Sequence, residues 1–228
     1  MHSITGSIFG FTQTGLPILA YRFQNPISSI GTTPPPKKVL ILGGVHGDEI
    51  EGVIAAQALL ACFAQEFPFH LDITLIPQFN LDGVLLKQRG NANGIDLNRN
   101  MATKDWSPES KTPRYNPGPS ANSESETRAL EKWILSESPH WILSLHSWQP
   151  VLNVNGDCSA QAQAIAKHTG YKIDDSIGYP TPGCLGTFAG IERNSPTLTY
   201  EIERGLPAKD ILTHIPGILE ALKVTENQ

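Results

Sequence analysis

The apolar and polar positions divide the chain into buried strands and amphipathic helices. Continuous apolar runs are typical of strands buried on both faces of a sheet, whereas apolar residues three and four positions apart are typical of helices. The runs predict strands at residues 39–42, 73–77, 141–145 and 197–202. The helical spacing predicts helices at residues 49–65, 123–138, 158–169 and 210–224. Because strands and helices alternate, we predict an α/β fold in which a mixed, mostly parallel sheet is sandwiched between helices.

The first 36 residues follow a different pattern. Residues 7–23 alternate loosely around Gly15-Leu16-Pro17, which predicts a hairpin at the edge of the sheet. Pro34-Pro35-Pro36 predicts a stiff connector that leads into the first core strand. No repeat or linker divides the 228 residues, so we predict one domain over residues 1–228.

Helix ends and loops carry further signals. Ser123, followed three residues later by Glu126, predicts a capping box at the start of the second helix. Gly170 is placed to end the third helix. Residues 80–119 are rich in Asn, Gly and Pro and have little periodicity. A loop of that length is either functional or disordered, and its dense polar cluster favours the functional interpretation.

Composition excludes several classes of function. The net charge of −5 and the pI near 5.8 give no electrostatic case for binding nucleic acid. No apolar run approaches the roughly 18 residues of a membrane helix, and residues 1–6 lack the features of a signal peptide. The three cysteines are odd in number and far apart, which argues against a disulfide framework. We therefore expect a cytoplasmic protein, although a chain whose leader had been removed would look the same.

Chemically reactive residues follow the predicted strands. His46 and Glu49 lie in the turn after the first core strand, and His146 follows the third. Two histidines and one glutamate, with a fourth position left to water, form the ligand set of a catalytic zinc ion. Zinc acidifies that water and polarises a carbonyl, as amide hydrolysis requires. Glu201, on the fourth strand, is our candidate for the base, although a lone His-x-x-Glu motif also occurs by chance.

The long loop contains a second group of polar residues, between Lys87 and Asn100. An arginine can grip a carboxylate with two parallel hydrogen bonds, and an asparagine amide can add another. Such a group suits a substrate with a free carboxylate beside the scissile bond. A solvated, turn-rich loop explains the same composition equally well.

Together, five motifs resemble the zinc carboxypeptidase family. They are His46-x-x-Glu49, Asn80-Leu81-Asp82-Gly83, Asp96-Leu97-Asn98-Arg99-Asn100, His146-Ser147 and Thr199-Tyr200-Glu201-Ile202. No single motif is specific, but their joint occurrence in this order is. Residues 43–49, 89–100 and 178–183 are most similar to the bacterial murein peptide amidase A branch of the family. The resemblance implies the zinc carboxypeptidase fold.

The resemblance also implies a role for each matching residue at the metal. His46, Glu49 and His146 would bind one zinc ion, and Glu201 would be the general base and acid. Asp96 would orient the imidazole of His46, a partnership that metal-bound histidine commonly has. A further implication is a cis peptide bond between Ser147 and the residue after it.

Substrate recognition is implied in the same way. Asn98 and Arg99 would hold the terminal carboxylate of the substrate, and Arg89 would stabilise the oxyanion. The family also has a mobile tyrosine over its substrate. Tyr179 is our candidate for it, and an ordinary loop aromatic is the alternative.

The branch implies a small murein tripeptide as the substrate, cleaved between the γ-carboxyl of D-glutamate and meso-diaminopimelate. Such peptides are recovered from the cell wall, which agrees with a cytoplasmic chain. The alternative is an N-acyl amino acid deacylase of the aspartoacylase or succinylglutamate desuccinylase type, since those enzymes share the His-x-x-Glu motif and the Asn-Arg pair. A binding module without catalysis is a more distant alternative.

Overall fold

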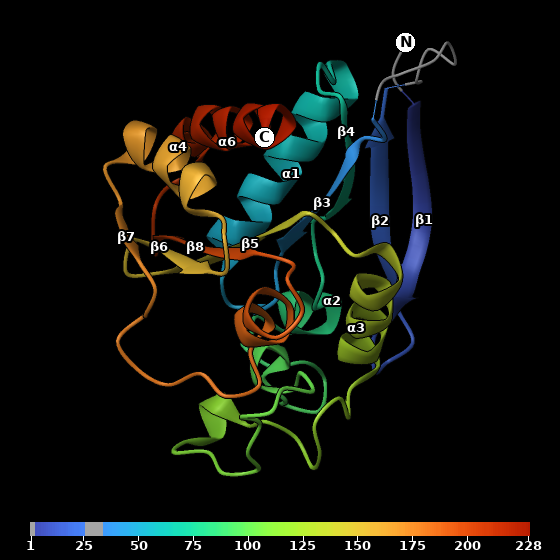
Figure 1. Ribbon diagram of the computed structural model, residues 1–228. Helices are drawn as coiled ribbons and strands as arrows, with labels where there is room; N and C mark the ends of the chain where they lie inside the picture. Colours follow the sequence, from blue (N-terminus) through green and yellow to red (C-terminus); the bar gives the residue numbers. More distant parts are fainter. Residues whose placement is uncertain (1–2, 26–33) are drawn as a thin grey trace.

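The computed structural model describes residues 3–25 and 34–228 (Figure 1). An eight-stranded sheet runs through the molecule in the order β1-β2-β4-β3-β5-β8-β6-β7. The strands are β1 (Ser3–Phe11), β2 (Pro17–Gln24), β3 (Lys37–Gly43), β4 (Leu71–Ile76), β5 (Trp141–Trp148), β6 (Val151–Asn155), β7 (Lys172–Asp174) and β8 (Thr197–Glu203). The strands β4, β3, β5 and β8 are neighbours and parallel, whereas β2 pairs antiparallel with β1 and β4. The strand β6 pairs antiparallel with β8 and parallel with β7. The predicted mixed sheet is confirmed.

Helices cover both faces of the sheet (Figure 1). The α-helices are α1 (Ile50–Gln65), α2 (Leu81–Leu86), α3 (Ser125–Glu137), α4 (Ser159–Thr169), α5 (Ala208–Ile211) and α6 (Ile215–Asn227). Short helical turns are η1 (Leu97–Arg99), η2 (Pro113–Tyr115), η3 (Gly186–Ile191) and η4 (Leu212–His214). One apolar core lies under α1, α4 and α6, and a second lies under α3 and η3. Among the described helices, none is both long enough and apolar enough to span a bilayer.

The central strands are buried because both of their faces meet a core. Val39 and Ile41 contribute to one core, while Leu40 and Leu42 contribute to the other, and all four are fully buried. An apolar residue at every position is therefore required, which explains the continuous run in the sequence. The carboxyl ends of these parallel strands meet at one edge, where open α/β sheets bind ligands.

The N-terminal hairpin is confirmed, with β1 and β2 pairing around the predicted turn. Most of β1 is exposed, so its loose alternation reflects an edge strand. Residues 34–36, in the proline connector, have no regular structure, while residues 1–2 and 26–33 lie outside the described residues.

Several local predictions were wrong. The loop expected from residue 80 begins with α2, whose six residues are too few to show helical periodicity. The helix α3 begins one residue later than expected, because Glu124 and not Ser123 is its N-cap residue. No side chain caps this end of the helix. Ser123 instead donates to Glu124, and Glu126 accepts from the backbone of Gln13. Tertiary hydrogen bonds therefore replace the expected capping box.

Other differences lie near the sheet. The strands β6 and β7 were not predicted, because they are short and only partly apolar. His146 lies within β5, whereas a position just after the strand was expected. The described backbone contains no cis peptide bond, so the expected cis bond after Ser147 was wrong.

Candidate metal centre and active site

A tight loop places His46 and Glu49 between β3 and α1. Glu49 is the N-cap residue of α1, so its side chain lies at the carboxyl edge of the sheet. A Cβ atom added to Gly47 would lie 1.9 Å from the carbonyl carbon of Gly83, at the start of α2. Only glycine permits this contact between the two backbones, which fixes the loop that carries His46.

A second glycine brings Glu49 to His146. A Cβ atom at Gly52, in the first turn of α1, would lie 2.4 Å from the carbonyl oxygen of Leu145. The helix therefore packs directly on the backbone of β5, one residue before His146. Because of this close packing, the carboxylate at the start of α1 reaches the imidazole on the strand.

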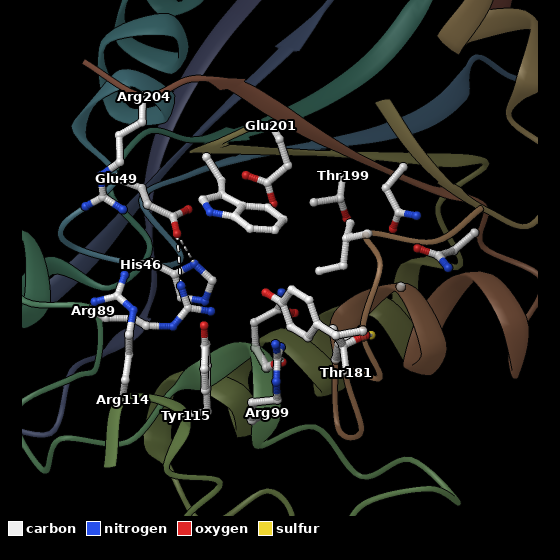
Figure 2. A pocket seen from close by; sticks show the side chains of 18 residues that line it. His46, Glu49, Arg89, Arg99, Arg114, Tyr115, Thr181, Thr199, Glu201 and Arg204 are labelled. Carbon is white, nitrogen blue, oxygen red and sulfur yellow. Dashed lines mark hydrogen bonds and ion pairs between the residues drawn. The ribbon is translucent and has the colours of Figure 1, made fainter. Parts of the chain in front are cut away.

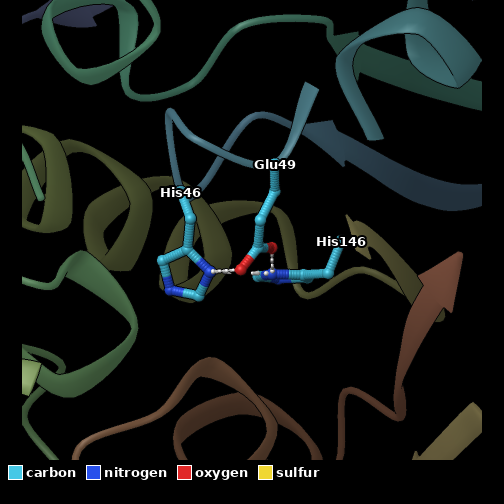
Figure 3. A group of neighbouring side chains, drawn as sticks. All are labelled: His46, Glu49 and His146. Carbon is cyan, nitrogen blue, oxygen red and sulfur yellow. Dashed lines mark hydrogen bonds and ion pairs between the residues drawn. The ribbon is translucent and has the colours of Figure 1, made fainter. Parts of the chain in front are cut away.

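The side chains of His46, Glu49 and His146 converge in a buried cluster (Figure 3). His46 Nδ1 lies 2.8 Å from Glu49 Oε1, and His146 Nδ1 lies 2.8 Å from Glu49 Oε2. The two Nδ1 atoms are 3.1 Å apart. In the described part of the chain, this is the one cluster of three such groups whose atoms all lie within 4.8 Å of one another.

This donor set fits a metal ion. Ligand atoms about 2.1 Å from a tetrahedral zinc ion lie roughly 3.4 Å apart, close to the spacing of the two imidazole nitrogens. Two imidazoles and one carboxylate are also the ligand types that zinc accepts. The remaining nitrogen of each imidazole has its own partner: His46 Nε2 lies 3.0 Å from Asp96 Oδ1, and His146 Nε2 lies 2.9 Å from Ser144 Oγ. These partners orient both rings with Nδ1 toward Glu49.

Arg89 and Asp96 surround the cluster with fixed charges. Arg89 donates from Nε to Asp96 at 2.8 Å and from Nη1 to Glu49 at 3.0 Å. Burial alone would raise the pKa of Asp96, but the charges of His46 and Arg89 have a larger, opposite effect. The pKa of Asp96 therefore lies well below its ordinary value. For Glu49, burial is likewise outweighed by both imidazoles, so its pKa also lies well below its ordinary value. Both carboxylates are therefore ionised and suited to cation binding.

Glu201 lies beside the cluster, opposite His146 in the register between β5 and β8. It is buried, and its Oε2 atom has no hydrogen-bond partner among the described residues. Burial raises the pKa of Glu201 to about 7. A carboxyl group with that pKa exchanges a proton readily near neutral pH, as a general base and acid must.

A pocket with an empty volume of about 640 Å³ connects these groups (Figure 2). The residues predicted for substrate recognition line it, namely Arg89, Asn98, Arg99 and Tyr179. Asn98 Oδ1 accepts from Leu185 N at 2.9 Å, so the amide orientation is fixed by the backbone. Arg99 donates to the carbonyl of Asn98 at 2.6 Å. His46, Glu49 and Glu201 line the same pocket. His146 and Asp96 do not line it but lie in contact with Glu49 and His46, respectively.

Tyr115 is a pocket residue that the sequence did not reveal. The guanidinium carbons of Arg89 and Arg99 lie 5.1 and 5.5 Å from its ring centroid. Its ring is 6.2 Å from that of Tyr179, which lies 5.8 Å from Trp148. Both guanidinium groups are therefore within cation–π distance of the Tyr115 ring.

Other lining residues were also missed: Arg114, Trp148, Asn153 and Asn155. Asn153 and Asn155 lie on β6, which was not predicted, and Arg114 lies in η2, a single helical turn that is too short to show periodicity. The turns that place such residues leave no repeating pattern in a single sequence.

Comparison with known proteins gives consistent results. A family model described as zinc carboxypeptidase matches residues 4–193. The murein peptide amidase A of Vibrio campbellii is 31% identical over 212 residues, which cover 87% of this chain and 79% of the relative. The family match includes the metal cluster and ends before Glu201.

Solved structures show the same fold. A murein-tripeptide amidase from Escherichia coli superposes with a TM-score of 0.70 at 24% identity, covering 97% of this chain and 90% of that one. A succinylglutamate desuccinylase from a Silicibacter species also gives a TM-score of 0.70, at 18% identity, and covers 98% of this chain and 67% of that one.

Proposed function

Because the chain belongs to the zinc carboxypeptidase family, we propose that it is a zinc-dependent amidase that acts on murein peptides. The family makes it a hydrolytic metallopeptidase or amidase. The bond we propose is the amide between the γ-carboxyl of D-glutamate and meso-diaminopimelate. The observation that carries the proposal is the buried His46–Glu49–His146 cluster, which shares one pocket with the unpartnered carboxyl of Glu201. The murein specificity is supported by the relatives named as murein peptide amidases.

We assign the metal to His46, Glu49 and His146, with Asp96 orienting His46 through Nε2. When bound, zinc supplies a polarised carbonyl and an acidified water. Arg89, between Glu49 and Asp96, directs positive charge at the position where the carbonyl oxygen becomes negative.

Glu201 performs the proton transfers. Its buried, unpartnered Oε2 is free to accept a proton from the attacking water. The same carboxyl then donates a proton to the nitrogen of the leaving amine. A pKa near 7 makes both transfers accessible at neutral pH.

Asn98, Arg99 and Tyr179 bind the part of the substrate that leaves. Arg99 supplies a guanidinium fork for the terminal carboxylate, and Asn98 adds its amide. Tyr179 lies against Tyr115 and Trp148 and covers the same part of the pocket. The proposed substrate is a small recycled peptide, for which the cytoplasm is the proposed compartment.

A product assay tests this function. The purified, zinc-loaded protein is incubated with L-alanyl-γ-D-glutamyl-meso-diaminopimelate, and products are identified by mass spectrometry. We expect release of free diaminopimelate and one zinc ion per chain. The matched control is Glu201→Gln, which should lower the rate by about 100-fold or more while retaining zinc.

The same assay separates the deacylase alternative, which is supported by the shared His-x-x-Glu motif and Asn-Arg pair and by the fold of the desuccinylase neighbour. N-succinylglutamate and N-acetylaspartate are tested beside the tripeptide. Hydrolysis of an N-acyl amino acid without cleavage of the tripeptide would contradict the murein assignment. Equal rates for wild-type protein and Glu201→Gln would contradict the role of Glu201.

A further inference from the structure

Two arginines meet at one carboxylate beside the metal cluster. Arg114, in η2, lies with Nη2 at 2.9 Å from Asp48 Oδ2. Arg204, just after β8, lies with Nη2 at 3.1 Å from the same oxygen. Arg204 also donates to the backbone oxygen of Asp48 at 2.7 Å. Asp48 immediately precedes Glu49, so the pair of guanidinium groups is fixed relative to the metal cluster.

The pair retains positive charge and free donors. A guanidinium has five N–H donors, and the interactions with Asp48 use only the Nη2 nitrogen of each arginine. Among the described residues, Nε and Nη1 of Arg114 and Arg204 donate to no protein group. Two guanidinium groups share one carboxylate, which leaves the group with a net positive charge. The side chains are 45% and 39% exposed, so a ligand can reach them.

Arg114 and Arg204 lie at the opposite end of the pocket from Arg99. Both line the pocket, and Figure 2 shows them on one side of His46 and Glu49, with Arg99 and Thr181 on the other. The metal cluster therefore separates two positively charged ends. A substrate whose terminal carboxylate is at Arg99 and whose scissile carbonyl is at the metal extends its acyl part toward Arg114 and Arg204.

We propose that Arg114 and Arg204, held by Asp48, form a second anion subsite that binds a free carboxylate on the acyl side of the scissile amide. The direction of the substrate rests on the proposed function. A γ-linked glutamyl residue keeps its α-carboxylate free near the bond that is cut. An ordinary α-linked residue has that carboxyl group in the peptide bond itself. The subsite therefore selects γ-glutamyl substrates over ordinary peptides through charge and bidentate hydrogen bonding.

Two substrates that differ only at this carboxylate test the proposal. One is L-alanyl-γ-D-glutamyl-meso-diaminopimelate, and the other carries D-isoglutamine, whose α-carboxylate is replaced by a carboxamide. For the zinc-loaded wild-type protein we expect kcat/KM to be about 10- to 100-fold higher with the free carboxylate, chiefly through a lower KM.

Variants test whether Arg114 and Arg204 cause the preference for the substrate with the free carboxylate. Arg114→Gln and Arg204→Gln should each lower kcat/KM for the carboxylate substrate, and the double variant should treat both substrates alike. Arg204→Lys should retain part of the preference, because it keeps the charge but loses the fork. The control is Lys223→Gln, on α6, which removes one positive charge from an exposed side chain away from the pocket. Zinc content and thermal unfolding are measured for each variant.

A binding measurement keeps this test independent of turnover. Calorimetry compares L-alanyl-D-glutamate, linked through its α-amine and carrying both carboxylates, with L-alanyl-D-isoglutamine on wild-type protein and on Arg204→Gln. We expect the wild-type protein to bind the first ligand more tightly, and the variant to lose the difference.

The outcomes separate the two proposals. Cleavage of both tripeptides at equal efficiency, or a preference that survives the double variant, would overturn the subsite and leave the amidase function standing. If the wild-type protein cleaves neither tripeptide, the amidase function fails and calorimetry decides the subsite. Equal binding of the two dipeptides, or no binding of either, would then overturn it.

Discussion

Glu201 shows how burial changes the pKa of an ordinary carboxyl. It lies in a wall of the pocket, packed beside His146, and one of its oxygens has no protein partner. In water a glutamate is ionised well below neutral pH, whereas burial raises the pKa of Glu201 to about 7. Burying this carboxyl in its ionised form lowers the free energy of unfolding.

This placement has a measurable cost in stability. The folded-state pKa of about 7 lies above the ordinary value of 4.5, so folded Glu201 retains a proton that the unfolded chain releases between these pH values. The stability contributed by Glu201 therefore falls as pH rises from about 4.5 to 7 and is constant above. Urea unfolding of the metal-free proteins measures the free energy of unfolding of Glu201→Gln and of the wild type. The difference, variant minus wild type, should be about 2–3 kcal/mol larger at pH 8 than at pH 5.

The control for this prediction is Glu203→Gln, at the exposed end of the same strand. This variant removes one carboxyl on the same strand and leaves the pocket lining unchanged. A difference for Glu201→Gln that does not vary with pH would contradict the raised pKa.

Asp96 is the residue for which metal affinity gives the clearest test. Its two oxygens contact His46 Nε2 and Arg89 Nε, and its side chain is fully buried. Asp96→Asn should lower zinc affinity by about 10- to 100-fold, because the amide orients and polarises the imidazole less strongly. Competition with a chelator measures the affinity, and the exposed Asp175→Asn is the control. Unchanged affinity would mean that the contact with Asp96 does not support the metal.

At the scale of elements, buried strands were the most predictable part of the chain. The strands β3 and β5 are apolar at nearly every core position, because both of their faces meet a core. The strands β6 and β7 lie toward the sheet edge, where partial exposure allows polar residues and hides the pattern. The helix α2 is too short to be recognised from periodicity.

The candidate site also contains residues that could be predicted from the sequence and residues that could not. His46, Glu49 and His146 could be proposed from the sequence because each lies at or near the end of a recognisable strand. Tyr115, Arg114 and the asparagines of β6 depend on turns and pairings that no short motif describes. A strand end can be located from local sequence, whereas the wall of a pocket is set by tertiary packing.

The contact between α1 and β5 gives a prediction at this scale. Gly52→Ala places a methyl group where the backbone of Leu145 now lies, so the first turn of α1 must move away from β5. That movement separates Glu49 from His146. We expect a loss of about 1–3 kcal/mol in stability together with weaker zinc binding.

Denaturant unfolding and zinc titration measure the two effects of Gly52→Ala. Gly6→Ala on β1 is the control, since its added methyl group would meet only the ring of Tyr21 at 3.9 Å. Loss of stability with unchanged zinc affinity would show that the close packing does not position the metal ligands.

At the scale of the whole molecule, the metal cluster joins distant parts of the chain. The candidate ligands come from the loop after β3, the start of α1 and the C-terminal half of β5, and His46 and His146 are 100 residues apart in the sequence. The unfolded chain lacks this arrangement, so a metal that binds only the folded state stabilises the whole domain.

We therefore expect zinc to raise the midpoint of thermal unfolding. At 100 times its dissociation constant, a ligand adds about 2.7 kcal/mol, which corresponds to roughly 5–10 °C in a domain of this size. Calorimetry with and without a chelator measures the shift, and His146→Ala should show almost none.

A single transition is expected, since we propose one domain over residues 1–228. Two separate transitions would contradict that proposal.

The position of β8 between β5 and β6 has a consequence for protein synthesis. A nascent chain emerging from the ribosome presents β5 and β6 long before residues 197–203 exist to fill the gap between them. Until then both neighbours expose unpaired edges, which invite pairing with other polypeptides. The candidate metal ligands are thus synthesised while the sheet is still open, and β8, which closes the sheet, brings Glu201 to the pocket only later. Chaperone protection during this interval would matter more for this chain than for one whose central strands are made first.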